Sequence, residues 1–154
     1  MTELPHTRSC FVCGEANPAG LKLRFETDGT IVRTRFTPAA EHVGFRHVVH
    51  GGITAAVLDE LMVWACAVRT RRFAFCAELT VRFVQPLRPG GEVLASAQLL
   101  VNRREKIFEA SGELRDPAGS LLASAAGKYL PIKQADQVSM ATDFVGDPRW
   151  VFEE

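Results

Sequence analysis

The residues best suited to chemistry lie in the run His50-Gly51-Gly52, which opens a long apolar stretch. The first turn of a helix has backbone N–H groups without partners inside the helix, and its dipole favours negative charge. Glycine at this point lets a substrate carbonyl group approach closely. The Gly52 N–H is therefore a candidate to stabilise a negatively charged oxygen that forms on a carbonyl group. The alternative is that the two glycines only allow a tight turn.

The stretch after these glycines predicts a buried helix over about residues 51–68. It contains no proline and no further glycine, and its apolar residues recur at helical spacing. One face carries Ile53, Val57, Leu61, Trp64 and Val68, and the opposite side carries Ala55, Leu58, Met62 and Cys66. A helix that is apolar nearly all round is a buried helix. Fewer than twenty apolar positions and two internal acids, Asp59 and Glu60, argue against a membrane span.

Asp59 is the predicted general base or nucleophile. A carboxylate is rarely buried without a partner, and attack needs its ionised form, so we expect a hydrogen-bond donor beside it. Asp59 follows Gly52 by seven residues, so both lie on one helix face, about 10.5 Å apart along the axis. Catalytic contacts need about 3 Å, so one reacting carbon cannot touch both residues of one chain. The spacing predicts a two-fold dimer in which Gly52 of one chain works with Asp59 of the other. The alternative is a buried acid paired with an arginine for stability alone.

Four cysteines raise the question of a metal or redox site. Cys10-x-x-Cys13 has His6 nearby, but the sequence has no second Cys-x-x-Cys or His-x-x-x-His, and a structural zinc site needs four ligands. A thioredoxin-like role would need a βαβ context. We therefore predict two buried thiols and no metal site. Cys66 and Cys76 lie in apolar segments, as reduced structural cysteines usually do.

The remaining pattern predicts an α+β fold in which an antiparallel sheet wraps around one long central helix. Alternating or apolar runs predict strands at residues 21–25, 31–36, 73–84, 93–101, 106–115 and 121–130. The last four of these read as a meander. We expect an irregular N-terminal segment over residues 1–20, one domain over 21–132 and a tail over 133–154. Part of the tail should pack against the domain, through Phe144, Trp150, Val151 and Phe152.

The composition excludes some classes of partner. The 154 residues carry 18 basic and 18 acidic side chains, so nothing indicates a charged field that gathers nucleic acid or a membrane surface. The N-terminus lacks the basic and apolar regions of a signal peptide. A cytoplasmic protein is the expectation.

Several segments together resemble one family. His50-Gly51-Gly52 with Asp59 in the following apolar helix is similar to the acyl-CoA thioesterases of the hotdog fold, of the phenylacetate-pathway type. The segments Cys10–Gly14 and Asn17–Leu21, the strand Ala77–Phe83 with Pro86, and Asp116–Gly119 with Leu122–Ala125 fit the same pattern. The resemblance covers about residues 10–132.

The resemblance implies the hydrolysis of an acyl-CoA thioester without a metal or dissociable cofactor, coenzyme A being part of the substrate. It implies that Asp59 is the active acid, that Gly51 and Gly52 provide the oxyanion site, and that His50 orients the loop or contacts the thioester. Glu60 becomes a structural, paired acid. A homodimer, and a pair of such dimers, is the implied assembly.

Cys76 and Gly44 depart from the family pattern, whereas Arg103 and Arg104 stand at positions that are basic in relatives. Cys76 stands where relatives carry Ser or Thr to place the water or the acid, and a thiol is a weaker donor. The alternative, which we favour, is that Cys76 is simply a core cysteine. Gly44 stands where some relatives place Asn or Gln on the carbonyl. Arg103 and Arg104 match basic positions near the coenzyme A end, although arginines in a polar loop are ordinarily solvated.

These departures keep a second reading open, a non-catalytic hotdog protein that binds acyl-CoA or another small ligand. A hotdog dehydratase or hydratase is a third option, but the acid and histidine pattern of those enzymes is not found here.

Overall fold

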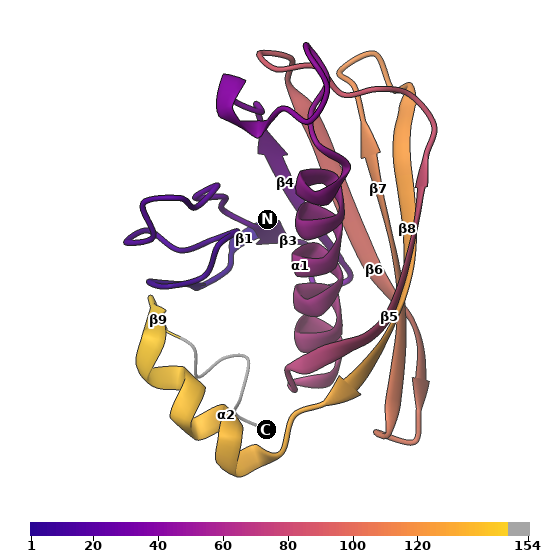
Figure 1. The fold of residues 1–154 in the computed structure, drawn as a ribbon. Helices are drawn as coiled ribbons and strands as arrows, with labels where there is room; N and C mark the ends of the chain where they lie inside the picture. The colour runs from indigo at the N-terminus through magenta and orange to yellow at the C-terminus, as the bar shows by residue number, and fades with distance from the viewer. Residues whose placement is uncertain (148–154) are drawn as a thin grey trace.

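A curved antiparallel sheet packs around one long helix in the computed structural model, which describes residues 1–147 (Figure 1). The sheet has seven strands in the order β1-β3-β4-β6-β7-β8-β5. Their bounds are Thr2–Glu3 (β1), Glu26–Thr27 (β3), Ile31–Phe36 (β4), Val93–Arg103 (β6), Ile107–Arg115 (β7), Leu121–Pro131 (β8) and Ala74–Phe83 (β5). The helix, α1, spans Gly51–Thr70. The expected α+β hotdog architecture is confirmed.

Helix α1 begins and ends where its sequence provides caps. His50 is the N-cap, and Arg71 ends the helix in the left-handed conformation, with its N–H bonded to the Ala67 carbonyl. By length and apolar composition alone α1 passes as a membrane span, as core helices commonly do. Ten of its residues are buried: Thr54, Val57, Leu58, Leu61, Met62, Trp64, Ala65, Cys66, Ala67 and Val68. The helix therefore supplies the centre of the core.

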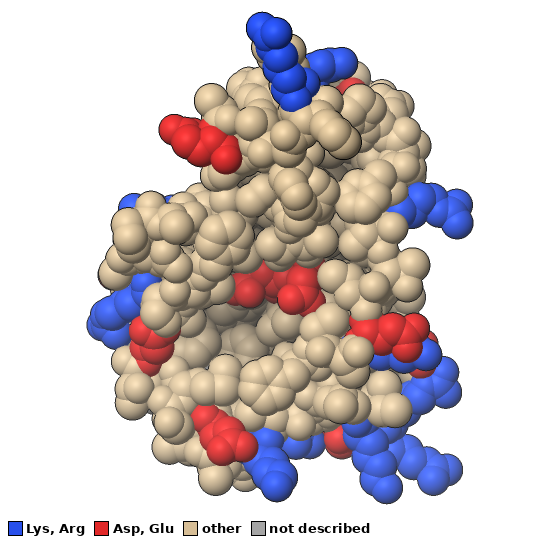
Figure 2. Space-filling model, in the orientation of Figure 1, with Lys and Arg blue, Asp and Glu red and all other residues tan. Residues whose placement is uncertain are grey.

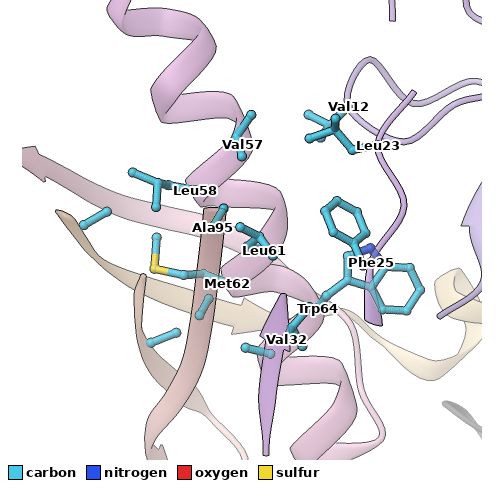
Figure 3. Packing of buried hydrophobic residues seen from close by; sticks show 14 of the residues in the cluster. Val12, Leu23, Phe25, Val32, Val57, Leu58, Leu61, Met62, Trp64 and Ala95 are labelled. Carbon is cyan, nitrogen blue, oxygen red and sulfur yellow. The ribbon is translucent and has the colours of Figure 1, made fainter. Parts of the chain in front are cut away.

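The core lies between α1 and the concave side of the sheet (Figure 3). Leu58, Leu61 and Met62 are fully buried against it. On another side of α1, the Trp64 ring packs on Phe25 and Phe73, with centroid distances of 6.4 and 5.0 Å. Burying rings of this size is a major source of stability, so the helix position is fixed from both sides.

The predicted four-strand meander is wrong in one respect, because β5 lies at the sheet edge beside β8 rather than beside β6. Periodicity identifies strands but does not name their partners, and the connection after β5 carries the chain across to β6. Two aromatic residues of β5, Phe75 and Phe83, are 63% and 57% exposed in this chain. A register shift between Cys76 and Glu78 breaks the alternation of β5. Within residues 1–147, β5 has no strand partner on its outer side.

The predicted strand at residues 21–25 does not form. Lys22 has a φ of 55°, which a strand does not allow. The alternation that suggested a strand is real, because Leu23 and Phe25 are both buried. Their segment bonds instead to the N-terminal loop, with the Leu23 N–H donating to the Val12 carbonyl at 2.9 Å.

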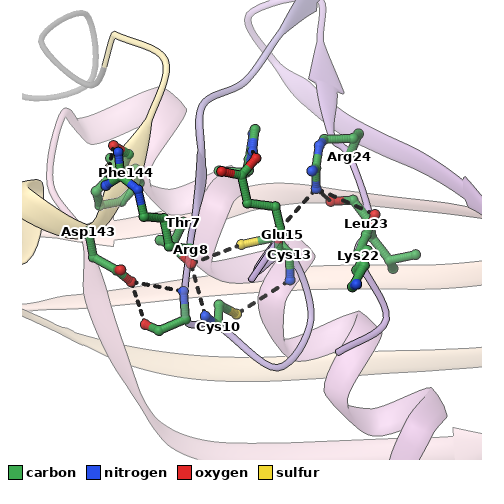
Figure 4. Close-up of polar contacts among 12 residues, drawn as sticks. Thr7, Arg8, Cys10, Cys13, Glu15, Lys22, Leu23, Arg24, Asp143 and Phe144 are labelled. Atoms are coloured by element: carbon green, nitrogen blue, oxygen red, sulfur yellow. Dashed lines mark hydrogen bonds and ion pairs between the residues drawn. The ribbon is translucent and has the colours of Figure 1, made fainter. Parts of the chain in front are cut away.

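The two ends of the chain are tied together (Figure 4). Strand β2 (His6–Thr7) pairs with β9 (Phe144–Val145), which follows helix α2 (Gln134–Met140) and the 3₁₀ turn η2 (Ala141–Asp143). A second 3₁₀ turn, η1 (Ala40–His42), lies in the connection before α1. The Asp143 carboxylate accepts hydrogen bonds from Ser9. The expected irregular segment and the described part of the tail, up to residue 147, thus form one structural unit over the open side of α1.

The expected packing of the tail is observed at Phe144. Its ring lies 6.0 Å from that of Trp64 and 5.5 Å from that of Phe73. Three other residues named for this role, Trp150, Val151 and Phe152, lie outside the described residues.

We expect Phe144→Ala to lower the free energy of unfolding by about 3 kcal/mol, because truncating a buried phenylalanine leaves a cavity. Urea denaturation followed by tryptophan fluorescence measures the change. The matched control is Val138→Ala in the same tail, where the side chain is 68% exposed and the expected change is below about 0.5 kcal/mol. Equal losses in both variants would contradict the packing described.

Candidate active site

The N-terminus of α1 is closed by the side chain of its own cap. The Gly52 N–H donates to His50 Nδ1 at 2.8 Å, and the Ile53 N–H donates to the His50 carbonyl at 2.9 Å. Such bonds satisfy backbone donors that a helix start leaves free. The predicted oxyanion donor is therefore occupied by His50 in this structure, and a substrate oxygen must displace or share that bond.

Space around His50 explains the glycines near it. A Cβ on Gly44 would lie 3.0 Å from His50 Cδ2, and one on Gly51 would lie 3.1 Å from Phe83 Cζ. Both distances are shorter than ordinary van der Waals contact. An Asn or Gln at position 44 would therefore compete with the imidazole ring. The glycine at position 44, where some relatives carry Asn or Gln, therefore makes room for the His50 ring.

An apolar cavity of about 630 Å³ opens beside this helix start. Loop residues before α1, the first turn of α1 and the segment after β5 form its walls: Gly44, Phe45, Val48, Val49, His50, Gly51, Thr54, Phe83, Val84, Gln85, Pro86 and Leu87. Phe45 is 86% exposed at this site. A cavity of this size, apolar with a few polar groups, has the character of a small-molecule site.

Asp59 has the hydrogen-bond donor that its predicted role requires. The hydroxyl of Tyr129 donates to Asp59 Oδ1 at 2.9 Å. Burial, and then the Asp59 carboxylate, raise the pKa of the Tyr129 hydroxyl, so it stays a donor at neutral pH. Within residues 1–147 no basic side chain forms an ion pair with Asp59. The partner is a tyrosine rather than the arginine of the alternative reading.

Cys76 belongs to the same group. It is the register partner of Tyr129 across β5 and β8, next to the register shift in β5. Burial, and then the nearby Asp59 carboxylate, raise the pKa of the Cys76 thiol. The thiol therefore remains protonated beside the carboxylate, in the place where the resemblance expects a hydroxyl. The interpretation of Cys76 as a core cysteine is wrong for the single chain, where its side chain is exposed.

Sequence reasoning missed Tyr129, although the strand pattern held a signal. Ala123, Ala125, Gly127 and Tyr129 alternate on the inward face of β8, and all are buried. Tyr129 is the only tyrosine of the chain, and a buried hydroxyl needs a partner. A Cβ on Gly127 would lie 2.6 Å from the tyrosine ring. The glycine makes room for the ring that reaches Asp59.

One chain does not bring all the predicted residues together. Because α1 is continuous, Gly52 and Asp59 remain about 10.5 Å apart along its axis. The turn that carries Arg103 and Arg104 lies at the end of β6, near the C-terminus of α1 (Figure 1), whereas the apolar cavity lies at the N-terminus of α1. Arg103 pairs with Glu109 at 2.7 Å. A contact between these arginines and coenzyme A stays a prediction.

Glu60 has a different partner from Asp59, its neighbour in the sequence. The two residues are about 100° apart around the helix, and Glu60 Oε1 lies 3.3 Å from Cys13 Sγ and 3.6 Å from Cys10 Sγ. Burial, and then the nearby Cys10, raise the pKa of Glu60 to about 8. In the orientation of Figure 1, acidic side chains lie in a central hollow, whereas the lysines and arginines visible on this face lie near the outline of the molecule (Figure 2). Glu60 is paired, as expected, and its partners are the thiols of Cys10 and Cys13.

Comparison with known families now places the chain. Residues 47–123, half of its length, match the thioesterase superfamily. The protein belongs to this superfamily, as its sequence indicated, and its fold is the hotdog fold. No curated protein matches the chain in sequence.

Solved structures give the same fold at low identity. The thioesterase superfamily protein RHA08564 superposes with a TM-score of 0.72 at 22% identity. The match covers 80% of this chain but only 63% of RHA08564, so this chain spans less than two thirds of that protein's length. PaaI of E. coli, from the phenylacetic acid degradation operon, gives 0.66 at 20% identity, covering 73% of this chain and 81% of its own. The protein smu.793 from Streptococcus mutans, solved with acetyl CoA, gives 0.64 at 11% identity, covering 71% and 88%.

We expect Tyr129→Phe to lower the free energy of unfolding by about 2 kcal/mol, because a buried hydrogen bond to a charged group is lost. Urea denaturation at neutral pH measures it. In the Asp59→Asn background the same substitution should cost about 1 kcal/mol or less, since the acceptor is neutral. Equal costs in the two backgrounds would show that the hydroxyl does not act on the Asp59 carboxylate.

Proposed function

We propose that this protein is an acyl-CoA thioesterase that hydrolyses its substrate in a homodimer. The observation that carries the proposal is the Tyr129–Asp59 hydrogen bond, which holds a carboxylate on the helix whose N-terminus borders an apolar cavity. Membership of the thioesterase superfamily supports the reaction class. The acetyl CoA bound to the Streptococcus mutans protein supports coenzyme A as the carrier.

In the proposed site, Gly52 of one protomer and Asp59 of its partner flank one thioester. The Gly52 N–H stabilises the oxyanion after His50 has moved from it. Asp59 takes a proton from water, the water oxygen adds to the carbonyl carbon, and the C–S bond breaks. The leaving sulfur takes the proton, so a carboxylic acid and free coenzyme A are released. Direct attack by Asp59 through an anhydride, opened by water, is the other route.

The exposed edge of the sheet supports the dimer. Among the described residues of one chain, the outer side of β5 has no strand partner and carries two exposed aromatic rings, Phe75 and Phe83. An apolar edge of this kind invites pairing with another strand. Self-pairing along β5 about a two-fold axis would also cover the apolar rim of the cavity at Phe83. A further pairing of dimers into a tetramer stays an expectation from the resemblance.

One observation favours the second candidate, an acyl-CoA binding protein without turnover. His50 occupies the Gly52 N–H, and if the imidazole does not leave, the substrate carbonyl receives no polarisation. Turnover by the purified protein separates the two functions.

We expect the wild-type protein to release thiol from acyl-CoA substrates, in a panel of aromatic and aliphatic thioesters. Asp59→Asn should reduce kcat by about a hundredfold or more, as loss of a general base or nucleophile does. Glu26→Gln, which removes an exposed carboxylate on β3, is the matched control and should leave kcat unchanged. Saturable binding of acyl-CoA without turnover by the wild type would instead establish the binding protein.

The shared site makes a separate prediction. Gly52→Pro removes the N–H at a helix position that tolerates proline, whereas the control Gly52→Ala retains it. Equal amounts of Gly52→Pro and Asp59→Asn chains, unfolded and refolded together, should recover about a quarter of wild-type activity, because half of the dimers then hold one intact site. No recovery, with mixed dimers verified by mass, would contradict a site built from two chains.

A further inference from the structure

The turn Cys10–Gly14 is built around the sulfur of its first cysteine. Cys10 Sγ accepts the Val12 N–H at 3.2 Å and the Cys13 N–H at 3.5 Å. The Gly14 N–H donates to the Cys10 carbonyl at 2.8 Å, and a Cβ on Gly14 would lie 2.2 Å from that oxygen. Only glycine therefore closes this turn. Two backbone donors aimed at one sulfur stabilise a thiolate.

The turn is held in place by its surroundings (Figure 4). Thr7 Oγ1 accepts the Cys10 N–H at 3.1 Å and lies 3.6 Å from Cys13 Sγ. Arg24 Nη1 donates to the Cys13 carbonyl at 3.0 Å. These contacts fix both sulfurs before any ligand arrives.

Helix α1 brings an oxygen to the two sulfurs. One atom, Glu60 Oε1, lies 3.3 and 3.6 Å from them, and the three candidate donor atoms all lie within 4.8 Å of one another. Tetrahedral zinc, with bonds of about 2.3 Å to sulfur and 2.1 Å to oxygen, requires sulfur–oxygen separations of about 3.5 Å. The observed separations match that requirement.

The charges of the cluster also suit a cation. The nearby Cys10 disfavours the negative charge of Glu60, and Cys10, burial and Glu60 raise the pKa of the Cys13 thiol. Within residues 1–147 no basic side chain forms an ion pair with Glu60. Cys10 and Glu60 are only partly buried, so an ion has access. A bound divalent cation would compensate all three ligands.

We propose that Cys10, Cys13 and Glu60 form a zinc site that fastens the N-terminal segment to α1. Two thiolates select a thiophilic metal such as zinc over magnesium or calcium. Three protein ligands leave a fourth position of the tetrahedron for water. No second cysteine pair marks this site in the sequence, because the third ligand, Glu60, comes from the central helix.

The experiment is metal binding by the reduced, full-length protein after removal of metal with a chelator. The wild type should bind one Zn²⁺ per chain, and Co²⁺ should give the charge-transfer absorption of thiolate ligands. The melting temperature should rise with Zn²⁺, because a metal that binds only the folded state stabilises it.

Matched variants test each ligand. Cys10→Ser/Cys13→Ser should abolish the cobalt absorption, and the isosteric Glu60→Gln should weaken Zn²⁺ binding by more than about a hundredfold, beyond what loss of an outer-shell group costs. Cys76→Ser, on the exposed thiol of β5, should bind Zn²⁺ as the wild type does.

Three outcomes would overturn the proposal. These are no stoichiometric Zn²⁺ binding by the folded wild type, retention of binding by the double cysteine variant, and unchanged affinity in Glu60→Gln. In each of these cases the thiols only donate hydrogen bonds to Glu60. Because the readout is metal binding rather than turnover, the result is independent of the proposed thioesterase activity.

Discussion

The structure depends on burying a helix that carries two adjacent carboxylates. Apolar residues cover α1 nearly all round, and the sheet, the N-terminal segment and the tail enclose it. Charge in such a place requires compensation, and the two acids obtain it differently. Asp59 accepts a hydrogen bond from Tyr129 of β8, whereas Glu60 faces the thiols of the Cys10–Gly14 turn. The helical offset of about 100° between neighbours thus separates a candidate reacting group from a candidate anchoring group.

Much of the fold was predictable because it rests on local pattern. The apolar periodicity of residues 51–68 gave α1, which extends to Thr70, and alternation gave β4 to β8 within one or two residues at most ends. Pairing of β5 with β8 was not predictable, because alternation on a strand carries no information on which neighbour it meets. The strand expected at residues 21–25 failed for a local reason, the left-handed backbone of Lys22.

The candidate site was predictable only in part. The spacing of Gly52 and Asp59 along one helix follows from helical geometry and needs no tertiary information. Tyr129 lies seventy residues from Asp59, and only the sheet register brings it there. Cys10 and Glu60 are fifty residues apart, and the packing of the N-terminal turn against α1 brings them together. The occupation of the Gly52 N–H by His50 depends on a side-chain conformation that residue types do not specify.

The pairing of β2 with β9 has a consequence for how the protein is made. His6 and Thr7 leave the ribosome well before their partners, Val145 and Phe144, are synthesised. Domains fold as their chains emerge, so the sheet and α1 can assemble while the N-terminal turn still lacks its outer support. The sulfur ligands would then be the most accessible during synthesis, and arrival of the tail would close the unit over them.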